Sequence, residues 1–212
     1  MVKQTKTRSG PGVSKTRRTV QAEQTKAEIL TVARRRFAAE GYAATTLRDI
    51  AAEAGVSVQT VFNSVGSKGD LVRQLNDLID DEAGIGELAA SVRDETDVSA
   101  LVVLPARITR RILERCGDIV RTSFDAARTE KGLGEVAAEG GRRHRAGAAA
   151  VAARLASLGA LAPNIDEQHA ATTLAALSET RLALVMLDDY GLDLDAVETW
   201  MSRTAKQVLL AH

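Results

Sequence analysis

A cluster of short hydrogen-bonding side chains is the feature of this sequence most suited to chemistry. Between residues 57 and 64 the chain carries hydroxyl and amide groups at Ser57, Gln59, Thr60, Asn63 and Ser64. Groups of these types form hydrogen bonds with base edges and with phosphate oxygens. The pattern therefore predicts a nucleic-acid contact surface. A helical hairpin with a polar solvent face would show the same pattern, so that alternative stays open.

Two short helices joined at a glycine are expected to position this surface. Thr46 and Asp49 form a predicted capping box at the start of the first helix. Gly55 supplies a left-handed turn at its end, and Ser57 caps the second helix. The first helix has an apolar face expected to be buried, formed by Leu47, Ile50, Ala51 and Ala54.

A third helix is predicted to begin at Ser67, with Asp70 as its capping-box partner. Lys68 lies in the first turn, where a positive charge opposes the helix dipole. A DNA phosphate would explain a lysine at this position.

A further helix precedes this unit. Thr25 and Glu28 are a candidate capping box, and Gly41 is expected to end the helix before Tyr42. Its predicted buried stripe consists of Ile29, Val32, Ala33 and Phe37.

Residues 25–75 resemble the DNA-binding domain of the TetR/AcrR family of transcriptional regulators. The resemblance rests on the spacing of F-x-x-x-G-Y, T-x-x-x-I-A, A-G-V-S, T-V-F and S-K within ILTVARRRFAAEGYAATTLRDIAAEAGVSVQTVFNSVGSKGDLV. It implies a phosphate contact at Thr46 and places Phe62, Ser64 and Lys68 at the groove rim. The family often has tyrosine in place of Phe62, so one phosphate contact is expected to be lost here. The complete predicted DNA-binding set is Thr46, Ser57, Val58, Gln59, Thr60, Phe62, Asn63, Ser64 and Lys68.

Charge divides the chain into two parts. Residues 1–75 carry 13 Lys and Arg against 6 Asp and Glu, whereas residues 76–212 carry 15 against 22. A basic N-terminal third is attracted to phosphate, while the acidic remainder is not. We expect an all-α protein with three parts: a basic disordered arm (1–22), a helix-turn-helix DNA-binding domain (23–75) and a larger helical ligand-binding and dimerisation domain (76–212).

The composition fits a cytoplasmic protein with no membrane association. The single cysteine, Cys116, excludes an internal disulfide framework. No apolar segment follows the basic N-terminus as in a signal peptide, and no uninterrupted apolar run has the length of a membrane span.

Beyond residue 75, every segment reads as helical. The expected helices cover 97–115, 118–130, 134–158, 166–188 and 193–210. Pro105 predicts a kink in the first of them. Asp195 and Glu198 form a candidate capping box for the last.

The last two helices are predicted to pair with a second copy as a four-helix bundle. The residues predicted to form the homodimer interface are Leu174, Leu177, Arg181, Leu184, Val197, Met201 and Val208. The alternative is that these stripes face the interior of their own subunit.

The family resemblance also implies an effector pocket between about residues 97 and 188. The scarcity of aromatic residues there argues against a cage of stacked rings and favours an aliphatic lining with one or two polar anchors. The candidate ligand-binding residues are Arg121, Phe124, Arg128, His144 and Arg181.

No catalytic residue, metal site or cofactor is predicted, because the three histidines and one cysteine form no ligand or nucleophile motif. The favoured function is a repressor released from its double-stranded DNA operator by a small-molecule effector. Alternatives are an activator or a regulator switched by a protein or by oxidation of Cys116, and an architectural DNA-binding protein.

Overall fold

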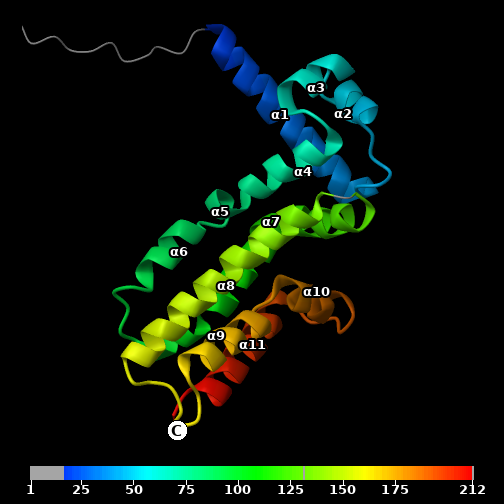
Figure 1. Cartoon of the computed structure of the whole chain (residues 1–212). Coiled ribbons are helices and arrows are strands. Elements are labelled where there is room, and N and C mark those ends of the chain that lie inside the picture. The colour runs from blue at the N-terminus through cyan, green and yellow to red at the C-terminus, as the bar shows by residue number, and fades with distance from the viewer. Residues whose placement is uncertain (1–16, 131, 212) are drawn as a thin grey trace, which may run out of the picture.

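The computed structural model describes residues 17–130 and 132–211, and this part of the chain is helical apart from turns and one isolated bridge between Leu161 and Leu210. Figure 1 shows α1, α2 and α3 together at one end of the molecule and the C-terminus at the other. The helices are α1 (Arg17–Glu40), α2 (Leu47–Glu53), α3 (Val58–Val65), α4 (Lys68–Asp77), α5 (Ile79–Glu82), α6 (Ile85–Ser91), α7 (Val98–Thr129), α8 (Gly134–Ser157), α9 (Glu167–Leu177), α10 (Thr180–Asp188) and α11 (Leu194–Leu209).

The helix-turn-helix forms as its sequence predicts. Thr46 and Asp49 make the reciprocal capping box, and Ser57 accepts a hydrogen bond from the backbone N–H of Thr60. Gly55 adopts φ +66°, a left-handed conformation that favours glycine. These local signals fix the angle at which α3 leaves α2.

The N-terminal helix is longer than expected. α1 begins at Arg17, so the prediction of disorder is wrong for residues 17–22, and residues 1–16 lie outside the described part. Thr25 makes no cap, because its hydroxyl donates to the backbone oxygen of Gln21 inside the helix. The polar first turns of α1 lack the apolar stripe on which the prediction relied.

The first core joins the predicted domains. Buried residues of α1–α4 pack with Cys116, Ile119 and Ala126 of α7 and with Leu133. α4 itself runs through the expected boundary between residues 75 and 76. The N-terminal unit is therefore packed on the helical body and not linked to it by a free segment.

The central helix bends, but not at its proline. α7 continues through Pro105, and its one non-helical residue is Cys116, at φ −133° and ψ 18°. The bend coincides with the break predicted between residues 115 and 118. Pro105 is buried and keeps helical backbone angles.

The segment predicted as one helix over 166–188 is two helices. Ser178 and Glu179 separate α9 from α10, and the buried hydroxyl of Thr109 donates to the carbonyl of Ser178 at 2.6 Å. By length and composition, Glu167–Asp188 is apolar enough to cross a membrane, with a mean hydropathy of 1.3, although core helices of soluble proteins meet the same criterion. Here the segment is interrupted and packs against α8 and α11.

The last helix, α11, begins at Leu194, directly after its capping residue Asp193. Asp193 caps α11 by accepting from the backbone N–H of Ala196, so the predicted box of Asp195 and Glu198 is not the cap. Asp195 and Glu198 instead pair with Arg110 of α7.

Most residues predicted for the dimer interface lie in the core of their own subunit. Leu174 and Met201 are each 1% exposed, and Val197 and Leu184 are also buried. Leu177 is partly buried in the same bundle. These stripes therefore serve the subunit interior, and of the predicted set only Arg181 and Val208 are exposed.

Candidate functional site

The outward face of α3 combines polar groups with two exposed apolar side chains. Phe62 is 57% exposed and Val58 is 43% exposed, while Val61 and Val65 hold the helix in the core. An exposed phenyl ring on a short, otherwise polar helix marks a contact surface. Apolar groups at such positions can pack against a thymine methyl group in the major groove.

The polar side chains of α3 are ordered by bonds to one another. Gln59 donates through Nε2 to Oδ1 of Asn63 at 2.8 Å, and the hydroxyls of Ser57 and Thr60 lie 2.9 Å apart. This arrangement leaves the amide oxygen of Gln59 and the amide nitrogen of Asn63 to meet an acceptor–donor pair on a base edge. The structure thus brings these four predicted residues together on one surface, with Ser64 partly buried at its end.

The start of α2 contributes a second exposed element. Thr46 is exposed and its hydroxyl donates to Asp49 at 2.5 Å. Arg48, which the sequence analysis did not select, is exposed beside it and forms no ion pair within the described chain. Arg48 lies in the first turn of α2, just after the capping residue Thr46, and this position in the sequence could have identified it as a candidate DNA contact.

Lys68 has an internal role. Its ammonium donates to the backbone oxygens of Tyr42 at 2.9 Å and Thr45 at 3.2 Å, and lies 4.1 Å from the centre of the Tyr42 ring. These contacts explain a lysine at the start of α4 without a ligand. A phosphate contact through its remaining hydrogen stays a prediction.

An arginine joins the DNA-binding unit to the helical body. Arg34 of α1 donates to both carboxylate oxygens of Asp118, at 2.5 and 2.8 Å, to Glu82 of α5 at 2.8 Å and to the backbone oxygen of Arg115 at 2.8 Å. Burial would raise the pKa of the Asp118 carboxyl, but the hydrogen bonds from Arg34 outweigh it, so that pKa is lowered. The three elements α1, α5 and α7 therefore meet at one guanidinium.

Cys116 lies beside this junction and is fully buried. Burial, and then the nearby Glu82 carboxylate, raise the pKa of its thiol to about 11. A thiol with this pKa stays protonated at neutral pH and is a poor nucleophile. The geometry therefore disfavours oxidation of Cys116 as the regulatory input.

We expect iodoacetamide to alkylate Cys116 in the folded protein far more slowly than it alkylates the same residue in denaturant. Mass spectrometry of timed samples gives both rates. The folded-state rate should keep rising as the pH approaches about 11. Rapid alkylation at pH 7 would instead support regulation by oxidation of Cys116.

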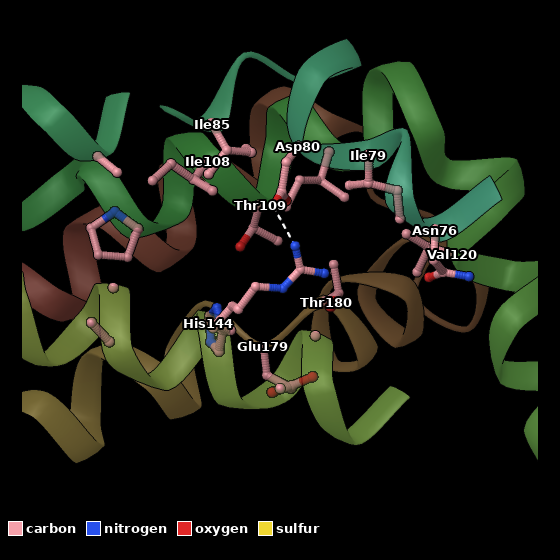
Figure 2. A pocket seen from close by; sticks show the side chains of 18 of the residues that line it. Asn76, Ile79, Asp80, Ile85, Ile108, Thr109, Val120, His144, Glu179 and Thr180 are labelled. Atoms are coloured by element: carbon pink, nitrogen blue, oxygen red, sulfur yellow. Dashed lines mark hydrogen bonds and ion pairs between the residues drawn. The ribbon is translucent and has the colours of Figure 1, made fainter. Parts of the chain in front are cut away.

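A cavity of about 540 Å³ lies in the helical body, between α4–α6 on one side and α7, α8 and the start of α10 on the other. This volume falls in the range of small-molecule sites, roughly 300–1,000 Å³. Figure 2 shows Ile79, Asp80 and Ile85 on one wall, with His144 and Glu179 opposite. Most other lining side chains are aliphatic, as predicted, and they include Val92, Leu104, Ile108, Ile112, Val120, Val136, Ala148 and Val151.

Two of the five predicted ligand anchors line this cavity, Phe124 and His144. Arg121 does not, because it pairs with Asp188 on the surface, and Arg128 is exposed elsewhere. Arg181 lies outside the lining and covers the Phe124 ring, with 4.6 Å between the guanidinium carbon and the ring centre. The sequence analysis missed the charged residues Asp80, Arg143 and Glu179, since only the fold brings them together.

Two further observations bear on chemistry. Within the described residues, no group of three or more His, Cys, Asp and Glu side chains could hold a metal ion. The largest exposed apolar side chains near the C-terminus are Val185, Tyr190, Leu192, Trp200 and Val208.

A family model described as "Bacterial regulatory proteins, tetR family" matches residues 29–75, which span the second half of α1, all of α2 and α3, and most of α4. No curated protein sequence matches the chain.

Solved structures share the fold over most of the chain. The SmeT–triclosan complex is 22% identical, with a TM-score of 0.71 over 89% of this chain and 92% of that one. A Saccharomonospora viridis protein in complex with choline is 18% identical, with a TM-score of 0.73 over 90% of this chain and 100% of that one. NalD, the secondary repressor of the MexAB-OprM efflux pump of Pseudomonas aeruginosa, is 18% identical, with a TM-score of 0.69 over 90% of this chain and 98% of that one.

Proposed function

We propose that this chain, a member of the TetR family, is a cytoplasmic transcriptional repressor that binds operator DNA as a homodimer. A small molecule bound in the cavity between α4–α6 and α7–α8 lowers its affinity for the operator. We assign it no catalytic activity and no cofactor.

The observation that carries this proposal is the exposed face of α3. Its ordered amides and hydroxyls, together with the exposed Phe62, form a surface with no use inside the subunit. A backbone-only architectural binder does not need amide side chains aimed at base edges. Sequence-specific reading is the function that uses them.

A dimer is proposed because α3 spans only Val58–Val65 and reads few base pairs. Two-fold pairing places two such helices in successive turns of the major groove. The exposed apolar residues Val185, Trp200 and Val208 on α10 and α11 support a second copy packing there. This surface replaces the buried stripes that the sequence analysis selected.

Control by a ligand is proposed because one short helix touches both sites. α5 lines the cavity with Ile79 and Asp80, and its Glu82 bonds Arg34 of the DNA-binding unit. A ligand that prefers one position of α5 shifts the balance between two arrangements of the recognition helices. Coupling of about 1–3 kcal/mol corresponds to 5- to 150-fold release. The triclosan complex of SmeT supports a small-molecule input in this fold.

The experiment is selection of genomic DNA fragments on the purified full chain, followed by sequencing. We expect the retained fragments to share a palindromic or near-palindromic motif whose half-sites lie about one helical turn apart or more. Retention of fragments without a common motif would favour the architectural alternative.

We expect Lys68→Met and Arg48→Met to weaken binding to all DNA sequences. Each substitution removes one positive charge per subunit. If the residue contacts a phosphate in both subunits of the dimer, the slope of log K against log salt should fall in magnitude by about 2 for that variant. Only Lys68→Met should also lower thermal stability, since Lys68 alone bonds two backbone carbonyls. Fluorescence anisotropy at several salt concentrations measures the slope. A Lys68→Met protein of lower stability but unchanged slope would confine Lys68 to its internal role.

A further inference from the structure

The hydroxyl and amide groups lining the cavity have already used most of their hydrogens. Thr109 donates its hydroxyl hydrogen to the carbonyl of Ser178 at 2.6 Å. Asn76 donates to a backbone carbonyl one turn earlier at 2.8 Å and to Oγ of Ser123 at 2.6 Å. Ser123 in turn donates to a backbone carbonyl at 2.8 Å. These groups can still accept hydrogen bonds through their oxygen lone pairs, but they have no free hydrogen to donate.

The two basic residues of the lining are also committed. Nε2 of His144 lies 2.9 Å from the carbonyl of Ala175. Because a carbonyl only accepts, this nitrogen carries the hydrogen, and in the neutral ring Nδ1 is then an acceptor. The guanidinium of Arg143 pairs with Asp80 across the cavity, and a dashed line marks this contact at Asp80 in Figure 2.

Two acidic lining residues lack a side-chain partner within the described chain: Asp81 is exposed to solvent, and the more buried of the two is Glu179. Its side chain is partly buried, forms no hydrogen bond or ion pair within the described chain, and gives α10 no side-chain cap. The first amides of α10 carry a partial positive charge, which the adjacent carboxylate offsets. Thr180, beside it, keeps a hydroxyl that can donate or accept. The unpaired charge in the cavity is therefore negative.

We propose that this cavity binds an amphiphilic cation: an aliphatic body lies along the apolar wall, and an ammonium group pairs with Glu179. The assignment rests on the proposed function only in treating this cavity as the effector site. An ammonium supplies donors to a lining that offers mostly acceptors, and its bonds to a carboxylate are charge-assisted. A ring cage is not the recognition device, because Phe124 is the only Phe, Tyr or Trp among the described residues that line the cavity, and Arg181 already covers its ring.

An anion is disfavoured by the same geometry. Asp80 already neutralises Arg143 through one Nη1 contact, and both side chains are about half exposed, at 47% and 48%. An anion that binds the remaining N–H groups of Arg143 would therefore lie near the Asp80 carboxylate, in a cavity that already holds the negative charge of Glu179. Removing the charge of Asp80 should therefore free Arg143 and shift the selectivity of the cavity toward anions.

The test is isothermal titration calorimetry of the full chain without DNA, using n-decylamine, n-decanol and n-decanoate below their micelle concentrations. The three share one apolar tail, and the amine is protonated at neutral pH. We expect decylamine to bind about tenfold or more tightly than decanol, and decanoate to bind most weakly. Glu179→Gln should abolish the advantage of the amine. Glu139→Gln is the matched control, since Glu139 pairs with Arg142 on the exposed side of α8.

Asp80→Asn supplies a test in the opposite direction, and should raise the affinity for decanoate while lowering that for decylamine. Tightest binding of decanoate to the unaltered chain, no binding of any probe, or an unchanged amine advantage in Glu179→Gln would each overturn the inference.

A separate gel shift keeps this result distinct from the proposed function. Amine binding without DNA release would contradict ligand control alone, whereas equal release by decanol and decylamine would contradict the cation alone.

Discussion

Arg34→Met is expected to lower the free energy of unfolding by about 2–3 kcal/mol. Loss of one partner from a buried ion pair costs roughly 3–5 kcal/mol, and the value is reduced here because Arg34 and Asp118 keep 26% and 31% exposure. The substitution removes four hydrogen bonds and leaves the Asp118 carboxylate facing an apolar side chain. Chemical denaturation of both proteins measures the difference.

The same substitution should reduce the release of DNA caused by a cavity ligand. Arg34 of α1 donates a hydrogen bond to Glu82 of α5, and α5 lines the cavity. Arg35→Met is the matched control: its side chain is 65% exposed and pairs with Glu53 on the surface. Combining Arg34→Met with Asp118→Asn isolates the pair in a double-mutant cycle. Equal losses of stability in Arg34→Met and Arg35→Met would show that the Arg34–Asp118 pair stabilises the fold no more than the exposed Arg35–Glu53 pair does.

Replacing Gln59 and Asn63 together by alanine is expected to abolish sequence-specific binding while preserving binding to random DNA. A good base contact is worth roughly 1–3 kcal/mol. A two-fold dimer loses the contact twice, so the total is about 2–6 kcal/mol, or about 30-fold to on the order of 10⁴-fold in affinity. The mutual hydrogen bond of these residues makes them one unit, so single and double substitutions should be far from additive.

Anisotropy titrations with a selected fragment and with a scrambled fragment measure both terms. Asn164→Ala, at an exposed position remote from α3 in the sequence, is the control and should change neither. If the double variant loses affinity for both fragments equally, these residues position the protein and do not read bases.

Local sequence signals predicted the recognition unit well. The boxes at Thr46–Asp49 and Ser67–Asp70, the cap at Ser57 and the turn at Gly55 each depend on a few neighbouring residues, and all are present. The bend of α7 at Cys116 also falls between the two segments, 97–115 and 118–130, into which the sequence was divided. Caps without such support, at Thr25 and Asp195, were placed wrongly because alternative partners were nearby.

Features that depend on tertiary packing were not accessible in the same way. Asp80 and Glu179 lie far apart in the chain and line one cavity only because α5 and the start of α10 flank it. Arg34 reads as one of three consecutive arginines, and its partners are distant in sequence. An apolar stripe shows that a face is buried but not against what, so Leu174 and Met201 were assigned to a second subunit instead of their own.

Footprinting on a selected fragment, with and without a ligand, tests the central claim most directly. The ligand is any compound that binds the unaltered chain but not Gly140→Leu, since Gly140 lines the cavity and a Cβ added there meets no atom within 4 Å, so a larger side chain can grow into the open space. We predict two protected half-sites related by a two-fold axis, whose protection disappears with the ligand in the unaltered chain and persists in Gly140→Leu. Uniform protection along the fragment, or protection that survives saturation of the cavity, would contradict the account.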